Sequence, residues 1–201
     1  MGVHLVQFLK KQGADIFVTS RQDIKSEKNL HYLQGDAISF DFLQECLLRQ
    51  KWDVIVDFMV YNTPMFEERI GLLLNATKQY IFLSSSRVYA NSEEPIAESS
   101  ARLLDVSDDL EYLKTDEYAL TKARQEDILK KSGKKNWTII RPYITYNENR
   151  LQLGVLEKEE WLYRALHGRK IIFSKDIMEK TTTLTYGLDV AKGIVGIMGK
   201  E

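Results

Sequence analysis

Short apolar runs alternate with helix-like segments along most of this chain. Residues 53–57 (Asp-Val-Ile-Val-Asp) and 79–83 (Gln-Tyr-Ile-Phe-Leu) have the length and composition of buried strands, and residues 67–78 between them have helical spacing. Strands that alternate with helices are typical of a parallel sheet covered by helices. The chain is therefore expected to adopt an α/β fold with helices on both faces of the sheet.

The same alternation predicts the remaining elements. Helices are expected over 3–11, 40–49, 116–131 and 157–167, and strands over 16–19, 30–33 and from 137. Asp189 is expected to be the N-cap of a last helix. The 201 residues, 44% of them hydrophobic, can bury one core, so we expect a single domain over 1–201.

Tyr118 and Lys122 stand four residues apart on the predicted 116–131 helix and so share one of its faces. An ammonium beside a phenol favours the ionised phenol, whose ordinary pKa is about 10. This spacing predicts a tyrosine that can act as an acid or base near neutral pH. The alternative is an ordinary side-chain pair on a solvated helix face.

Three serines, Ser84, Ser85 and Ser86, follow the predicted 79–83 strand. A serine hydroxyl at a strand end could hold a substrate oxygen against the phenol of Tyr118. Together with Lys122, the arrangement suits the oxidation of an alcohol or the reduction of a ketone.

The segments Ser84-Ser85-x-x-Val88-Tyr89, Tyr118-x-x-x-Lys122, Arg141-Pro142 and 185–191 (Thr-Tyr-Gly-Leu-Asp-Val-Ala) resemble motifs of the extended short-chain dehydrogenase/reductase superfamily. The resemblance is to its NAD-dependent epimerase/dehydratase branch and spans nearly the whole chain. It implies a Rossmann-like sheet that binds NAD or NADP, with Ser85, Tyr118 and Lys122 as catalytic residues and Ser86 as the alternative serine. The later Tyr-Gly-Pro motif is only partly matched, because Asn147 follows Tyr146.

The resemblance also implies a set of cofactor-binding positions. These are Gly2, Ser20, Arg21, Asp36, Phe58, Tyr118, Lys122 and Pro142. Arg21 follows the second strand of the resembled fold, where a basic side chain suits the 2′-phosphate of NADP, so NADP is slightly favoured over NAD. A solvated loop arginine is the alternative, and Phe58 could instead be a core residue.

The beginning of the chain departs from the resembled pattern. Residues 2–8 are similar to the helix that starts at the last glycine of Gly-x-x-Gly-x-x-Gly, so the usual first strand and two earlier glycines are expected to be lacking, and the chain looks shortened at both ends. Loss of that central strand would leave the edges of its neighbours unpaired. The amides of the glycine loop hold the pyrophosphate, so the chain as given is expected to bind NAD(P) weakly.

Residues 147–182 are expected to form a small, partial C-terminal substrate lobe. In the resembled family this lobe meets a nucleotide sugar, and Arg150, Arg164 and Arg169 are candidates to contact its phosphates, with solvated arginines as the alternative. The leading hypothesis is an NAD(P)-dependent epimerase/dehydratase or reductase acting on a nucleotide sugar or a related hydroxyl or keto substrate. The alternative is a non-catalytic dinucleotide-sensing or scaffold protein of the same fold.

The charge and composition of the chain limit the kinds of partner that it is expected to bind. The net charge is −1 and basic residues are interspersed with acids, whereas a nucleic-acid or membrane-surface role generally needs a concentrated basic face. The lysines at 130–135 suit a solvated helix end. Cys46 reads as a buried helix residue, and the three scattered histidines suggest no metal site. A cytoplasmic protein with a small-molecule substrate is expected, and a homodimer is compatible with this reading.

Overall fold

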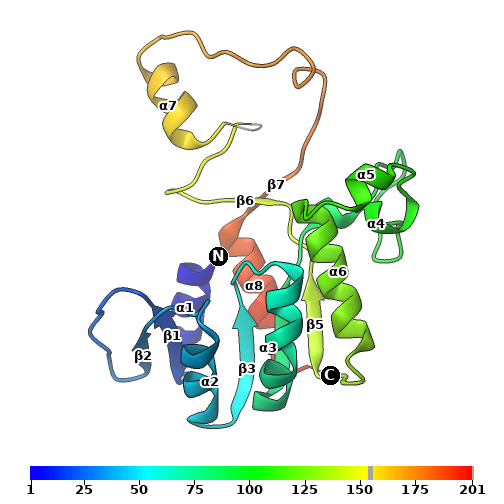
Figure 1. Ribbon diagram of the computed structural model, residues 1–201. Helices are drawn as coiled ribbons and strands as arrows, with labels where there is room; N and C mark the ends of the chain where they lie inside the picture. The colour runs from blue at the N-terminus through cyan, green and yellow to red at the C-terminus, as the bar shows by residue number, and fades with distance from the viewer. Residues whose placement is uncertain (154–155, 201) are drawn as a thin grey trace.

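The computed structural model describes residues 1–153 and 156–200 and has an α/β architecture (Figure 1). Its elements, in chain order, are α1 Gly2–Lys11, β1 Ile16–Ser20, β2 Leu30–Gln34, α2 Phe40–Leu48, β3 Trp52–Asp57, α3 Thr63–Ala76, β4 Thr77–Leu83, η1 Ser86–Val88, α4 Leu103–Val106, α5 Leu110–Leu113, α6 Tyr118–Lys131, β5 Trp137–Ile140, β6 Ile144–Tyr146, α7 Lys158–Leu166, β7 Leu184–Tyr186 and α8 Gly187–Ile197. The predicted alternation is confirmed.

All strand pairs are parallel, but they do not form one continuous sheet. Strand β1 pairs with β2, and β3, β4 and β5 form a second sheet with β4 in the middle. Within the described ranges no hydrogen-bonded ladder joins β1 to β3.

Two hydrophobic clusters lie on opposite faces of the sheets. Alternate residues of β4 point to different sides: Tyr80 and Phe82 belong to the cluster packed by α2, α3 and α6, whereas Ile81 and Leu83 belong to the cluster packed by α1 and α8. This period of two is what an extended strand imposes. Because both faces are covered, the helices hold the strand ends, and the loops that follow them, in fixed places.

Two boundary predictions were wrong. Helix α3 begins at Thr63 rather than Glu67, because the Asn62 side chain caps it by accepting a hydrogen bond from the Met65 amide (2.9 Å). Asp189 is not an N-cap: α8 begins at Gly187, directly after β7, and Asp189 lies in its first turn. A carboxylate is still favourable there, because it faces the positive end of the helix dipole.

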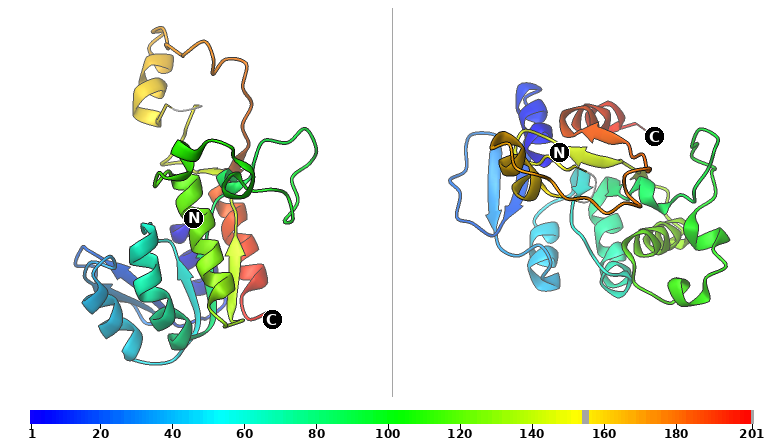
Figure 2. Two further views of the ribbon diagram at one scale, coloured as in Figure 1. Left: turned by 45° about the vertical axis from the view of Figure 1, so that its right-hand side comes forward. Right: turned by 90° about the horizontal axis from the view of Figure 1, so that it is seen from above.

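The expected substrate-lobe segment lies between β6 and β7, which pair with each other in parallel. The left view in Figure 2 shows α7 and its flanking segments, in yellow and orange, standing clear of the main body on the side of the strands' carboxyl ends. No residue of α7 is buried. The boundaries of a lobe at 147–182 remain a prediction.

The part of the chain that the structure describes contains no helix that is both long and apolar enough to cross a membrane.

Candidate active site

The end of β4 and the turn after it position the three serines differently. The Ser84 hydroxyl donates a hydrogen bond to the buried Glu126 carboxylate (2.6 Å), so it is engaged in the protein interior. The Ser85 oxygen caps η1, accepting from the Arg87 amide (3.2 Å), and the Ser85 side chain is close enough to the Tyr118 phenol to lower its pKa. Of the three, Ser85 is therefore the serine that the structure brings to Tyr118.

Tyr118 is the first residue of α6, and its neighbours hold that helix start in place. Glu117 caps the helix by accepting from the Ala119 amide (2.6 Å), and the Arg87 guanidinium donates to the same carboxylate (2.6 Å). The Tyr112 hydroxyl also donates to Glu117 (3.3 Å). Tyr118 remains 39% exposed, so its hydroxyl can meet a ligand at the surface.

The pKa of Tyr118 is raised above its ordinary value, which corrects the expectation that Lys122 would bring it down. Partial burial of the phenol is the main cause, and it outweighs the lowering effects of Ser85, Arg87 and Arg150. The two cations that act on the phenol are arginines far away in sequence. The phenol therefore carries its proton at neutral pH.

Lys122 is turned inward from Tyr118. Its ammonium donates to the Leu83 carbonyl (2.8 Å) and lies 4.6 Å from the centre of the Phe82 ring, whereas the centre of the Tyr118 ring is 5.9 Å away. Only 3% of Lys122 is exposed. Burial lowers the pKa of its ammonium to about 8, although Asp57 and Glu126 act in the opposite direction.

Glu126 lies one turn after Lys122 on α6 and connects the buried side of the site through hydrogen bonds. Its carboxylate is fully buried and accepts from Arg141 through Nε (2.8 Å) and Nη2 (2.7 Å), in addition to Ser84. The Arg102 guanidinium lies 3.4 Å from the same carboxylate and also forms ion pairs with two partly exposed acids, Asp105 and Asp127. This network ties α6 to the ends of β4 and β5, which fixes Ser85 relative to Tyr118.

A second buried carboxylate lies at the end of β3. Asp57 accepts from the Tyr80 hydroxyl (2.7 Å) and from the Met59 amide (2.9 Å), and burial raises its pKa. Phe58, the next residue, is 37% exposed and is therefore not a core side chain. It stays available to contact a ligand, as the family resemblance implies.

The other expected cofactor positions lie at the same edge. Gly2 begins α1, whose first amides have no side-chain cap; Ser20 ends β1 and Arg21 is exposed beside it; and Pro142 follows β5. Asp36 follows β2 and accepts from the Ile38 amide (3.0 Å). Gly35 before it has a packing role, because an added Cβ would lie 2.2 Å from the Phe42 ring.

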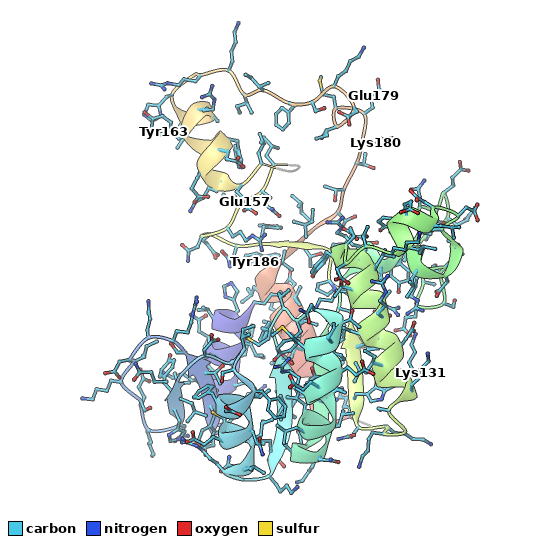
Figure 3. The ribbon with its side chains drawn as sticks, viewed as in Figure 1. Lys131, Glu157, Tyr163, Glu179, Lys180 and Tyr186 are labelled. Atoms are coloured by element: carbon cyan, nitrogen blue, oxygen red, sulfur yellow. The ribbon has the colours of Figure 1, made fainter. Side chains whose placement is uncertain are left out.

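One structural observation indicates that these residues fit an NAD-type cofactor. The uncapped amides at the start of α1 are a ready site for a phosphate, and they face the same sheet edge as Tyr118. Lys131, labelled in Figure 3, lies at the far end of α6, so the basic cluster at 130–135 is at the opposite edge from the site.

Sequence reasoning missed the contributions of Glu126, Arg102 and Arg87. Glu126 stands four residues after Lys122, and an acid on the apolar face of a helix is the signal that could have found it. Arg87 lies in the short helix η1 and Arg102 lies directly before α4, and no periodic sequence pattern surrounds either residue. Their roles depend on which helix they meet in space.

A parallel sheet flanked by helices, with a serine, a tyrosine and a lysine gathered at the carboxyl ends of its strands, defines the class of Rossmann-fold short-chain dehydrogenases/reductases. The NAD dependent epimerase/dehydratase family matches residues 1–201. The chain belongs to this family.

One curated protein is similar to this chain over its whole length. The chain is 27% identical over 225 residues to the chloroplast stem-loop binding protein of 41 kDa b from Arabidopsis thaliana, covering all of this chain and 53% of that protein. The chain thus spans about half the length of this curated relative.

Solved structures share the fold. The Bordetella bronchiseptica enzyme WbmH, solved with NAD+, has a TM-score of 0.74 at 14% identity, with 99% of this chain and 69% of that chain covered. The UDP-glucuronic acid 4-epimerase of Bacillus cereus, solved with UDP-glucuronic acid and NAD, has a TM-score of 0.70 at 18% identity, with 100% and 70% covered.

Proposed function

We propose that this chain carries the catalytic residues of an NAD(P)-dependent epimerase/dehydratase or reductase acting on a nucleotide sugar or a related hydroxyl or keto substrate. The observation that carries the proposal is that Ser85, at the end of β4, lies beside a partly exposed Tyr118 at the start of α6, at the carboxyl edge of a parallel sheet. Family membership and the UDP-sugar complexes among the structural neighbours support it.

Tyr118 is the proton-transferring group in this proposal. Because its phenol is protonated at neutral pH, the residue is ready to donate a proton to a substrate carbonyl oxygen, and it takes the proton back when an alcohol is oxidised. Ser85 orients the same substrate oxygen by hydrogen bonding. Tyr118 and Ser85 can carry out both the proton transfer and the orientation of the substrate oxygen from the positions that they have in the structure.

The expected cofactor supplies hydride transfer when it is bound. The start of α1 would hold its phosphates, and Lys122 would hold its ribose and act on the phenol. In the structure the Lys122 ammonium donates a hydrogen bond to the Leu83 carbonyl.

The three candidate phosphate-binding arginines differ in position. Arg164 donates to the Lys170 carbonyl (3.0 Å), and Arg169 lies over the Tyr163 ring, so both are engaged on α7 and its flank. Arg150 pairs with Glu157 (3.1 Å) and acts electrostatically on Tyr118. Figure 3 shows Glu157 and Tyr163 on the lobe side of the molecule. We assign the contact with an anionic substrate to Arg150.

The test is replacement of the phenol hydroxyl. Tyr118→Phe should reduce turnover of a UDP-sugar at millimolar NAD by about a hundredfold or more, because one acid–base group contributes roughly 10²–10⁴-fold. Ligand affinity measured by calorimetry should change little, because the ring remains. Tyr32→Phe, on β2, is the matched control and should leave both quantities unchanged. Equal turnover by the two variants would exclude the proposed role.

A non-catalytic binding protein of the same fold is the second candidate. The curated relative has a name that describes stem-loop binding. Calorimetric titration with NADH and NADPH separates the two candidates when combined with turnover. Binding without any turnover in wild type and Tyr118→Phe alike would favour the sensing or scaffold role.

A further inference from the structure

Arg87 lies on η1, two residues after Ser85, and its backbone is held firmly against the rest of the site. The Ser86 amide donates a hydrogen bond to the Pro142 carbonyl at the end of β5 (3.0 Å), and Val88 is fully buried. Helix η1 also contacts α6. The position from which the Arg87 side chain starts is therefore fixed relative to Ser85 and to the start of α6.

The guanidinium group of Arg87 is anchored beside Tyr118. Its Nη2 donates to the Glu117 carboxylate (2.6 Å), and its Cζ lies 5.9 Å from the centre of the Tyr118 ring. The same carboxylate accepts from the Ala119 amide (2.6 Å) and from the Tyr112 hydroxyl (3.3 Å). Because Glu117 is itself held by these two donors, it keeps the Arg87 charge at the first turn of α6.

Tyr118 needs a cation at this place whenever it gives up its proton. Proton donation to a substrate oxygen leaves a phenolate, and a partly buried phenolate is costly unless a positive charge lies near it. The groups that act on the phenol are Ser85, Arg87, Arg150 and Glu117. Burial is the main influence and raises the pKa of Tyr118, the serine and the two arginines lower it, and Glu117 raises it.

The other two cations near the phenol are engaged elsewhere. The Lys122 ammonium also lies 5.9 Å from the centre of the Tyr118 ring, but it is buried and donates to the Leu83 carbonyl. Arg150, after β6, pairs with Glu157 at 3.1 Å. Arg87 is the cation whose anchor, Glu117, is the residue directly before Tyr118.

We propose that Arg87 is a positioning residue for Tyr118: its guanidinium, anchored on Glu117, holds a positive charge beside the phenol and stabilises the phenolate that proton donation leaves. Arg87 serves the proton transfer assigned to Tyr118, so this role rests on the proposed function. The charge acts through Tyr118 and needs no contact between Arg87 and the substrate.

The test measures the ionisation of the phenol directly, in the 201-residue chain without substrate or cofactor. A fluorinated tyrosine at position 118 has a more acidic phenol than tyrosine, and its fluorine NMR signal reports that position alone, while circular dichroism checks that the chain stays folded. Arg87→Gln removes the charge but keeps a side-chain amide that can donate to Glu117. Arg49→Gln is the matched control, because Arg49 is exposed and pairs with Glu45 (3.1 Å) on α2. Arg87→Lys keeps the charge.

We expect the phenol to titrate at a higher pH in Arg87→Gln than in wild type, with at least about a twofold fall in the ratio of phenolate to phenol at the wild-type midpoint. Arg87→Lys should restore most of this ratio, and Arg49→Gln should leave it unchanged. Added salt should narrow the difference between wild type and Arg87→Gln, because the Arg87 side chain is 62% exposed.

Three results would overturn the role of Arg87: an unchanged midpoint in Arg87→Gln, an equal rise in Arg49→Gln, or no recovery in Arg87→Lys. Faster hydrogen exchange of the Ala119 amide in Arg87→Gln without a change in midpoint would reduce Arg87 to a structural support of the helix start. The outcome is separable from the activity test. The proposed function fails if Tyr118→Phe keeps its turnover, whereas the role of Arg87 fails if the phenol titrates independently of that charge.

Discussion

The buried carboxylate of Glu126 allows a quantitative prediction about stability. It accepts hydrogen bonds from Ser84 and twice from Arg141, at 2.6–2.8 Å, with no exposed surface. Glu126→Gln leaves the guanidinium groups of Arg141 and Arg102 without this counter-charge. Breaking a buried ion pair by removing one partner costs about 3–5 kcal/mol, so we expect a loss of that order in unfolding free energy.

The direction in which pH changes the stabilisation by Glu126 follows from the shift of its pKa. Burial alone raises the pKa of Glu126, but hydrogen bonds from Arg141 and Ser84 outweigh it, and the pKa is lowered in the folded state. The stabilisation is therefore present above the ordinary carboxyl pKa of 4.5 and is lost as the pH falls through the lower folded value. The difference between wild type and Glu126→Gln should be constant near neutral pH and should shrink in acid.

Urea unfolding followed by tryptophan fluorescence measures the effect. Glu45→Gln is the matched control: Glu45 pairs with Arg49 at 3.1 Å, but its side chain is 70% exposed, so we expect a loss below about 0.5 kcal/mol. The slope of unfolding free energy against urea should stay constant, because the surface exposed on unfolding is similar.

A double replacement tests whether the charges are coupled. Glu126→Leu with Arg141→Met removes both partners, and Arg102 keeps Asp105 and Asp127. We expect the pair to cost less than the sum of the single changes, because neither charge is left alone. Strict additivity, or a loss below about 1 kcal/mol for Glu126→Gln with an unchanged slope, would refute the reasoning.

Two further predictions concern the cofactor edge. Lys122→Met should stabilise the chain at pH 7 by up to ~3 kcal/mol, the free energy equivalent to lowering the lysine pKa from 10.5 to about 8. The gain in urea midpoint should shrink from pH 8 to 10.5, because the folded wild-type protein loses the costly buried charge before the unfolded chain does. A gain that does not depend on pH would contradict the burial argument. Arg21→Ala should weaken NADPH binding about tenfold in calorimetry and leave NADH binding unchanged, because only NADPH carries the 2′-phosphate. The control Lys25→Ala, in the same exposed loop, should change the affinity for neither cofactor. Equal weakening of NADPH and NADH binding by Arg21→Ala would argue against a contact between Arg21 and the 2′-phosphate.

The alternation of apolar runs and helical segments was enough to predict the α/β fold, because strand and helix periods are local properties of a sequence. Tyr118 and Lys122 could be placed on one helix face for the same reason, and the serines could be placed at a strand end. Boundaries were less predictable. The Asn62 cap moved the start of α3, because a side-chain cap at a polar residue competes with apolar periodicity.

The sequence by itself determined the element types, the parallel sheet and the residues gathered at its carboxyl edge, because these follow from periodicity and from the direction of parallel strands. Only the tertiary structure decided what those residues experience. Lys122 lies beneath Tyr118 and points to Leu83, so burial, rather than the neighbouring ammonium, sets the pKa of the phenol. Likewise Glu126 meets Ser84 across 42 positions of sequence, and such long-range contacts depend on packing that no local pattern encodes.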